Sequence, residues 1–185
     1  MASTQKTHNK SGSEWLSLMG KTDAQVAHFV VILKEKLEKT THDEFEVIDG
    51  SRCITMSAKD GRLTVNSKKV CFGYQLVAWE KYGRDNMGMV SSAKVGGEAL
   101  TISHLCGVRN CCERDHIIIE PKKVNDDRTH HHGTVFHAFH NNKCGQKSFL
   151  DLLGLVRDTC GHEPKCFTKE TGANVYEEVK GVFKY

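Results

Sequence analysis

The stretch SHLCGVRNCCERDHIIIEP, residues 103–121, places three cysteines and two histidines within nineteen positions. Cysteine and histidine are the side chains that hold structural zinc, and four of them complete a tetrahedral site. Cys106, Cys111 and His116 are separated by four residues at each step, so one short loop can bring them to a single ion. The stretch therefore predicts a zinc-stabilised loop that lacks one ligand.

The missing ligand must come from another part of the chain. Cys53 is the best candidate, because it lies in the β-rich segment RCITM and strand pairing can carry it to the loop. Cys112 could take the place of Cys111, since the spacing does not distinguish these two neighbours. His104 remains after the zinc ligands are assigned and is available for another purpose.

A second set of metal ligands lies downstream. Cys160, His162 and Cys166 fall within seven residues, and Cys144 precedes them with fifteen residues between it and Cys160. Three cysteines and one histidine again form a complete set for structural zinc. The sequence therefore predicts a second zinc site.

The segment KKVNDDRTHHH follows Pro121 and contains neither glycine nor proline, which predicts a polar helix. It ends in three adjacent histidines at residues 130–132. Neighbouring residues on a helix diverge by about 100°, so they seldom share one ion. We interpret this run, with His137 and His140, as solvated or packing side chains.

Composition sets limits on where and with what the protein works. The 185 residues suit one domain, and a net charge of +3 permits a nucleic-acid partner without arguing for one. We find no secretory signal and no run of about 20 apolar residues. We therefore expect a soluble intracellular protein without a membrane partner, whose eight cysteines bind metal rather than form disulfides. The segment PKKV resembles a nuclear import signal but begins the predicted polar helix, so a nuclear location stays open.

Helices and strands alternate along the chain. Residues 71–83 are predicted to form a helix that ends at Gly83, followed by a glycine-rich connection over residues 84–99. The segments LTISHL and HIIIEP are predicted strands on either side of the cysteine-bearing loop. Residues 23–40 are predicted to form an amphipathic helix, because apolar residues recur at helical spacing at Val26, Phe29, Val30, Leu33 and Leu37.

A β-hairpin is predicted around a turn at residues 59–61. On its second arm Leu63 and Val65 share one face by the period-two rule. The residues on the opposite face of this arm are polar. A polar face suits contact with phosphates and base edges in a DNA groove, although an ordinary solvated strand face has the same pattern. That opposite face consists of Arg62, Thr64, Asn66 and Lys68.

The pattern SHLC-x4-C-x4-H followed by KKVNDDR resembles the zinc-binding loop region of the His-Cys box homing endonucleases, a branch of the His-Me finger (ββα-metal) nucleases. The resemblance extends from about residue 52 to residue 166. It implies an α+β fold of small mixed sheets and helices around a ββα-metal motif, stabilised by two structural zinc sites. It also implies a double-stranded DNA substrate and a homodimer.

The resemblance assigns roles residue by residue. His104 is the general base, and Asn125, twenty-one positions later, holds a single catalytic Mg²⁺. The first zinc site comprises Cys53, Cys106, Cys111 and His116, and the second comprises Cys144, Cys160, His162 and Cys166.

The chain departs from the family pattern in two features. The family places an arginine near the scissile phosphate, where this chain reads NSKKV. Lys68 is the expected substitute, and Lys69 joins the residues of the polar strand face as an expected DNA contact. The C-terminal tail that joins family dimers has no counterpart in this sequence.

The sequence therefore predicts a Mg²⁺-dependent, zinc-stabilised, site-specific DNA endonuclease. Its alternatives are a non-catalytic zinc protein that binds nucleic acid as a regulator, and a nonspecific nuclease with the same finger. We expect a disordered tail over residues 1–13 and one nuclease domain over 14–185. That domain would contain the N-terminal helix at 23–40, a DNA-binding hairpin region at 45–70, the ββα-metal motif at 98–132 and a second zinc module at 144–166.

Overall fold

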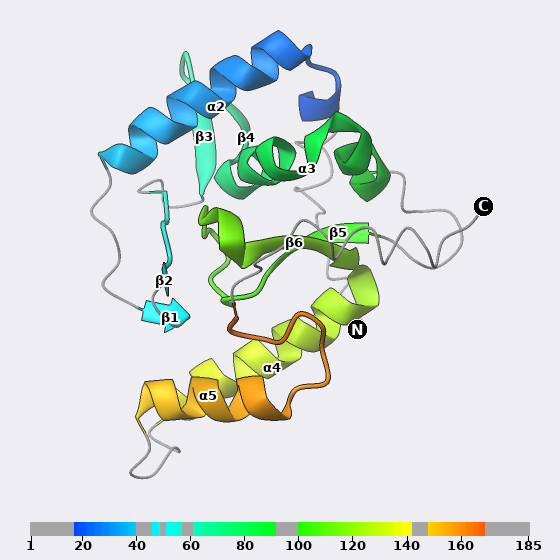
Figure 1. The fold of residues 1–185 in the computed structure, drawn as a ribbon. Helices are drawn as coiled ribbons and strands as arrows, with labels where there is room; N and C mark the ends of the chain where they lie inside the picture. Colours follow the sequence, from blue (N-terminus) through cyan, green and yellow to red (C-terminus); the bar gives the residue numbers. More distant parts are fainter. Residues whose placement is uncertain are drawn as a thin grey trace, which may run out of the picture.

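The computed structural model describes residues 17–39, 46–48, 51–56, 61–91, 100–141 and 148–168. In this part of the chain the strands pair consecutively into two-stranded antiparallel sheets, so the fold is α+β as predicted (Figure 1). The elements, in chain order, are α2 (Asp23–Glu38), β1 (Glu46–Ile48), β2 (Ser51–Arg52), β3 (Arg62–Val65), β4 (Lys68–Phe72), α3 (Gly73–Ser91), β5 (Leu100–His104), the 3-10 turn η1 (Arg114–His116), β6 (Ile117–Pro121), α4 (Lys122–His140) and α5 (Phe149–Thr159).

The β5–β6 hairpin lies at the centre of the structure. Its register runs from Leu100 opposite Pro121 to His104 opposite Ile117, and α4 begins directly after Pro121. Figure 1 shows α2 and α3 on one side of this hairpin and α4 and α5 on the other. The predicted strands, loop and polar helix thus form a continuous ββα unit.

Two groups of buried side chains form the core, one on each side of this hairpin. Ile117 and Ile119 belong to the group shared with α2, α3 and the β3–β4 hairpin. Ile118 belongs to the second group, toward α4 and α5. Because successive strand residues point to opposite faces, the run of three isoleucines supplies both cores.

The predicted helix over residues 23–40 is confirmed by α2, whose N-terminus is closed by a capping box between Thr22 and Gln25. The interruption predicted at Gly83 is confirmed, but a second helical segment follows it where a glycine-rich connection was predicted. Gly83 has non-helical φ and ψ angles of 76° and 168°, so α3 consists of two helical segments that meet at a kink there, and the second segment ends at Ser91. The continuation is stabilised because Arg84 donates to Asp23, at 2.6 Å, and to two backbone carbonyls before α2.

The predicted continuous strand face from Arg62 to Lys68 is also wrong. Asn66 and Ser67 adopt positive φ angles of 48° and 61°, so the chain turns back there, and β3 pairs with β4. Arg62 and Lys68 therefore lie on different strands. The turn predicted at residues 59–61 falls largely outside the described residues, as residues 57–60 do.

On the opposite side of the molecule, α4 is longer than the predicted polar helix, and α5 was not predicted. Ser148 caps α5 through a reciprocal hydrogen-bonding pair with Asp151. Leu153 and Val156 face the second core. Within the described residues, none of the helices is both long and apolar enough to cross a membrane.

Candidate active site and metal centres

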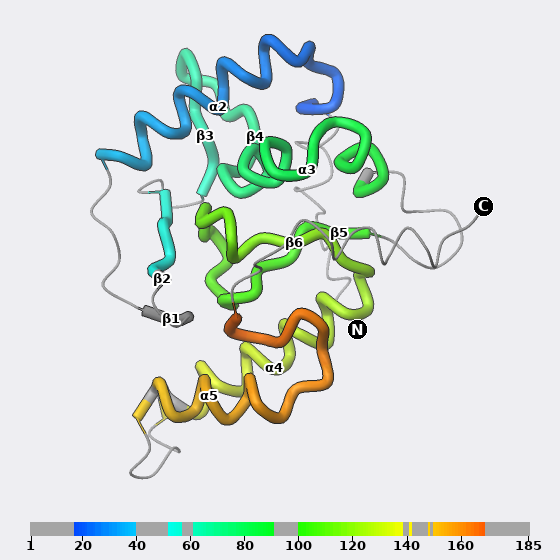
Figure 2. The backbone as a smooth tube through the Cα atoms, in the orientation of Figure 1, coloured from blue at the N-terminus to red at the C-terminus, as the bar shows by residue number. Residues whose placement is uncertain are grey.

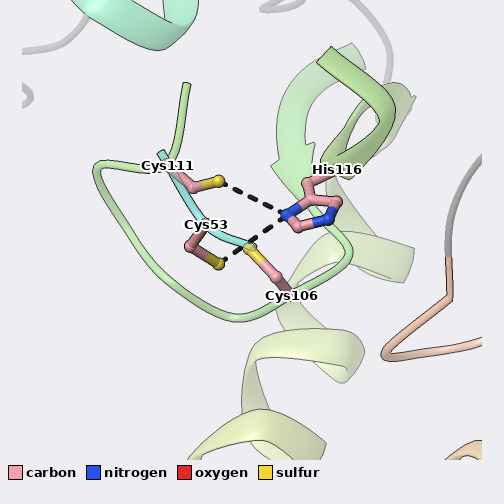
Figure 3. A group of neighbouring side chains, drawn as sticks. All are labelled: Cys53, Cys106, Cys111 and His116. Carbon is pink, nitrogen blue, oxygen red and sulfur yellow. Dashed lines mark hydrogen bonds between the residues drawn. The ribbon is translucent and has the colours of Figure 1, made fainter. Parts of the chain in front are cut away.

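The first candidate metal centre consists of four buried ligands, shown in Figure 3. Cys53 follows β2, Cys106 and Cys111 lie in the loop after β5, and His116 ends η1. Their ligand atoms all lie within 4.8 Å of one another. His116 Nδ1 is 3.4 Å from Cys111 Sγ and 3.7 Å from Cys53 Sγ.

These distances fit zinc. A tetrahedral zinc ion with sulfur at about 2.3 Å and nitrogen at about 2.0 Å places its sulfur and nitrogen ligands about 3.5 Å apart. Strand pairing delivers Cys53 as predicted, because Thr55 bridges to Cys111 and the Cys112 N–H donates to the Ile54 carbonyl at 2.6 Å. The side chain of Cys112 instead packs in the first core, so Cys111 is the member of the pair that joins the cluster.

The electrostatics of this cluster favour a bound cation. Burial raises the pKa of the Cys106 thiol well above its usual range. Hydrogen bonds from the Cys106 and Cys53 thiols lower the pKa of the Cys111 thiol and so favour its thiolate form. A buried thiolate among further thiols is stabilised most by a metal ion that replaces the remaining thiol protons.

The second candidate centre contains two of the predicted ligands and one residue, His131, that was not predicted. His131, His162 and Cys166 place their ligand atoms within 4.8 Å of one another. Cys166 Sγ lies 3.4 Å from His162 Nδ1 and 4.0 Å from His131 Nδ1. Cys160 is adjacent, since its sulfur accepts a hydrogen bond from the Cys166 N–H at 3.2 Å. Cys144 lies outside the described residues.

His131 was missed because the three adjacent histidines were interpreted together as solvated or packing residues. Their divergence around the helix excludes a shared ion, but it leaves any single one available as a ligand. His132 does pack, against Phe167 with ring centroids 4.7 Å apart. His131 instead faces His162, at 4.8 Å between centroids. The two clusters provide ligand sets for two zinc ions.

We expect His131 rather than Cys144 to complete the second zinc site. The wild-type protein should contain about two zinc ions per chain by elemental analysis, and Cys144→Ser should retain both. His131→Ala should lose about one, because a three-ligand site holds structural zinc poorly. His130→Ala, the exposed neighbour, is the matched control. Loss of zinc from Cys144→Ser but not from His131→Ala would contradict this assignment.

His104 ends β5 and is not a member of the first metal cluster. Its Nε2 lies 3.2 Å from the Cys111 carbonyl oxygen, and its ring meets Tyr74 edge to face at 4.9 Å between centroids. Burial lowers the pKa of His104, so the imidazole is neutral at pH 7. A carbonyl oxygen only accepts, so Nε2 carries the proton and Nδ1 holds the lone pair.

Asn125 lies in the first turn of α4, half-buried. Its Oδ1 accepts a hydrogen bond at 2.9 Å from the Ser103 hydroxyl. Ser103 directly precedes His104 on β5, so the structure holds Asn125 against the strand that carries His104. An amide oxygen is a ligand type that Mg²⁺ accepts, and one lone pair of Oδ1 remains beyond the bond from Ser103. The residues present therefore fit a divalent cation held mainly by water and substrate.

The predicted DNA contacts occupy two positions on the β3–β4 hairpin. Asn66, Lys68 and Lys69 are exposed at or beside its turn, and Figure 2 shows this turn directed away from β5 and β6. Thr64 is half-buried and lies opposite Lys69. At the base of the hairpin the Arg62 guanidinium lies 4.6 Å from the centroid of the Phe72 ring. The structure thus leaves Lys68 at the turn, and its role near the scissile phosphate stays a prediction.

Comparison with known proteins identifies the family. Residues 45–177, more than half of the chain, match the family described as the zinc-binding loop region of homing endonuclease. No curated protein and no solved structure shows a significant match. The matched residues include both clusters of metal ligands, the β5–β6 hairpin and α4. The chain therefore belongs to the His-Cys box type of homing-endonuclease family.

Proposed function

We propose that the protein is a metal-dependent endonuclease that hydrolyses double-stranded DNA with His104 as its general base. The observation that carries this proposal is the orientation of His104. The hydrogen bond to the Cys111 carbonyl makes Nε2 the protonated nitrogen and leaves Nδ1 basic. A zinc protein that only binds nucleic acid needs no such histidine beside its metal cluster.

The chemistry assigns a proton transfer to His104. Nδ1 accepts a proton from a water molecule as that water attacks phosphorus, and the bond from phosphorus to the leaving oxygen breaks. The Cys111 carbonyl then stabilises the imidazolium through the Nε2–H bond, because a carbonyl oxygen accepts more strongly from a cation. General-base catalysis of this kind contributes about 10²- to 10⁴-fold in rate.

Asn125 would hold a Mg²⁺ ion through Oδ1, and the bound ion would supply positive charge at the phosphate and at the leaving oxygen. Ser103 orients the amide for this purpose through its hydroxyl. The two zinc clusters serve structure: the first fixes the loop that carries the Cys111 carbonyl, and the second fixes α4 beside it.

The β3–β4 hairpin is the proposed DNA-contacting surface. Its cationic side chains lie at two positions along the hairpin, Arg62 at the base and Lys68 and Lys69 at the exposed turn. Cations separated in this way suit phosphates that are spaced along a groove. Recognition of one defined site, and of its two half-sites by a homodimer, is part of the proposal.

Cleavage assays with plasmid and genomic DNA test the function. The wild type should cut DNA in the presence of Mg²⁺ and should not cut it in buffer without Mg²⁺. Omission of Mg²⁺ is preferred to a chelator, because a chelator would also remove the zinc ions. His104→Ala and Asn125→Ala should each slow cleavage at least about 100-fold while zinc content and circular dichroism stay unchanged. His130→Ala, an exposed histidine of the same helix as Asn125, should cut normally.

Other results would favour the alternatives. DNA binding without cleavage of any substrate, a genomic library included, would support a zinc-containing regulator. Cleavage of every DNA without site preference would support a nonspecific nuclease. Full activity of either active-site variant would remove the role assigned to that residue.

A further inference from the structure

Tyr74 links the DNA-contacting hairpin to His104. It is the second residue of α3, which begins directly after β4. Its ring meets the His104 imidazole edge to face, with centroids 4.9 Å apart and an interplanar angle of 75°. Phe72 is a further neighbour and stacks on Tyr74, with ring centroids 5.4 Å apart and an interplanar angle of 21°.

We infer that Tyr74 is a positioning residue that fixes the ring plane of His104. The inference rests on the proposed role of His104 as the general base. A single hydrogen bond through Nε2 fixes one point of the imidazole but lets the ring turn about that point. A second contact with the ring restricts this freedom, and the Tyr74 ring supplies one at 4.9 Å between centroids and an angle of 75°.

The orientation of Tyr74 is itself determined by its neighbours. Phe72 stacks on it, and the guanidinium of Arg62 lies 4.6 Å from the Phe72 centroid. Arg62 and Phe72 are cross-strand partners. A column of side chains therefore runs from the base of the hairpin to His104. We call it the aromatic column; it consists of Arg62, Phe72 and Tyr74.

The rate of a reaction depends strongly on the position of its general base, even when that residue contributes little to substrate binding. A displacement of about 1 Å of a catalytic group can cost on the order of 100-fold in rate without weakening substrate binding. The hairpin turn, where Lys68 and Lys69 are exposed, lies away from the column. Arg62, a further proposed DNA contact, lies over the Phe72 ring, which stays in place when the Tyr74 ring is lost. Loss of the Tyr74 ring should therefore reduce the rate of the chemical step and leave DNA affinity intact.

Single-turnover cleavage by full-length variants tests this inference. Tyr74→Leu should cut about 10- to 100-fold more slowly with the DNA dissociation constant changed less than about twofold. Tyr74→Phe keeps the ring and should restore the wild-type rate. Tyr82→Phe is the matched control, because this tyrosine lies on the same helix and its hydroxyl donates to the Ile117 carbonyl. Tyr74→Met, unbranched and adaptable, replaces Tyr74→Leu if that variant does not fold.

Nuclear magnetic resonance of isotope-labelled histidine distinguishes a change in the position of the His104 ring from a general loss of stability. The ring current of Tyr74 shifts the His104 ring protons, so their resonances should move in Tyr74→Leu and stay in Tyr74→Phe. If Tyr74→Leu cleaved DNA at the wild-type rate, or if its cleavage rate fell only in proportion to its DNA affinity, this inference would be wrong and the proposed function would be unaffected. A wild-type protein that cuts no DNA would overturn the proposed function and this inference with it.

Discussion

Replacement of Cys106 by serine is expected to unfold the part of the protein that contains α4, α5 and the loop after β5. Serine is not a zinc ligand, so the first cluster loses its metal. Structural zinc of this kind contributes on the order of 10 kcal/mol to folding. Domain stabilities are about 5–15 kcal/mol in total, so the variant should be largely unfolded or aggregated at 25 °C.

The composition of the second core explains why the effect is so large. Five of its ten buried residues are cysteines. Four of these belong to the two metal clusters, namely Cys53, Cys106, Cys111 and Cys166, and the fifth, Cys160, lies beside Cys166. Apolar side chains alone are few there. Metal–ligand bonds thus replace much of the hydrophobic burial that would otherwise join the β5–β6 hairpin to α4 and α5.

Thermal unfolding, zinc content and circular dichroism measure this effect. Cys112→Ala is the matched control, because Cys112 is the next buried cysteine along the loop but packs in the first core. It should retain its zinc and lose only about 1–2 kcal/mol of stability. If Cys106→Ser kept its zinc and its unfolding temperature, the ligand role of Cys106 would be wrong.

The first metal cluster and the ββα unit could be predicted because their signals are local. Cys106, Cys111 and His116 belong to one loop, the flanking strands are apolar, and the helix follows Pro121 directly. Only Cys53 required a long-range contact, and its β-rich segment indicated how that contact would form.

The features that the sequence did not predict depend on contacts between distant segments or on unusual backbone angles. His131 joins the second candidate cluster because α4 packs beside residues 160–166, about thirty residues later in the chain. The turn at Asn66 and Ser67 uses positive φ angles without glycine, so it lacks the usual turn signal. The contact between Tyr74 and His104 joins two elements whose packing no local pattern reveals.

Replacement of Arg128 by methionine is expected to lower the free energy of unfolding by about 3–5 kcal/mol. Arg128 is fully buried and pairs with Glu120 through two hydrogen bonds, of 2.9 and 3.1 Å. Glu120 is 4% exposed, so removal of the guanidinium leaves a buried carboxylate without its partner. Denaturant unfolding measures this loss. The double variant Arg128→Met with Glu120→Leu should recover much of it, because an apolar pair of similar size avoids the buried charge.

Zinc retention should separate the second role of Arg128 from this ion pair. Arg128 Nη1 lies 3.5 Å from Cys166 Sγ. Burial raises the pKa of the Cys166 thiol to about 12, and the charge of Arg128 acts against that rise. Without Arg128 the thiol holds its proton more strongly, and zinc must displace it. The double variant should therefore regain stability but release one zinc ion to a chelator faster than the wild type does. Glu120→Gln keeps the guanidinium of Arg128, so it should release zinc more slowly than the double variant. Equal release rates in the double variant and the wild type would show that Arg128 stabilises the fold through Glu120 alone.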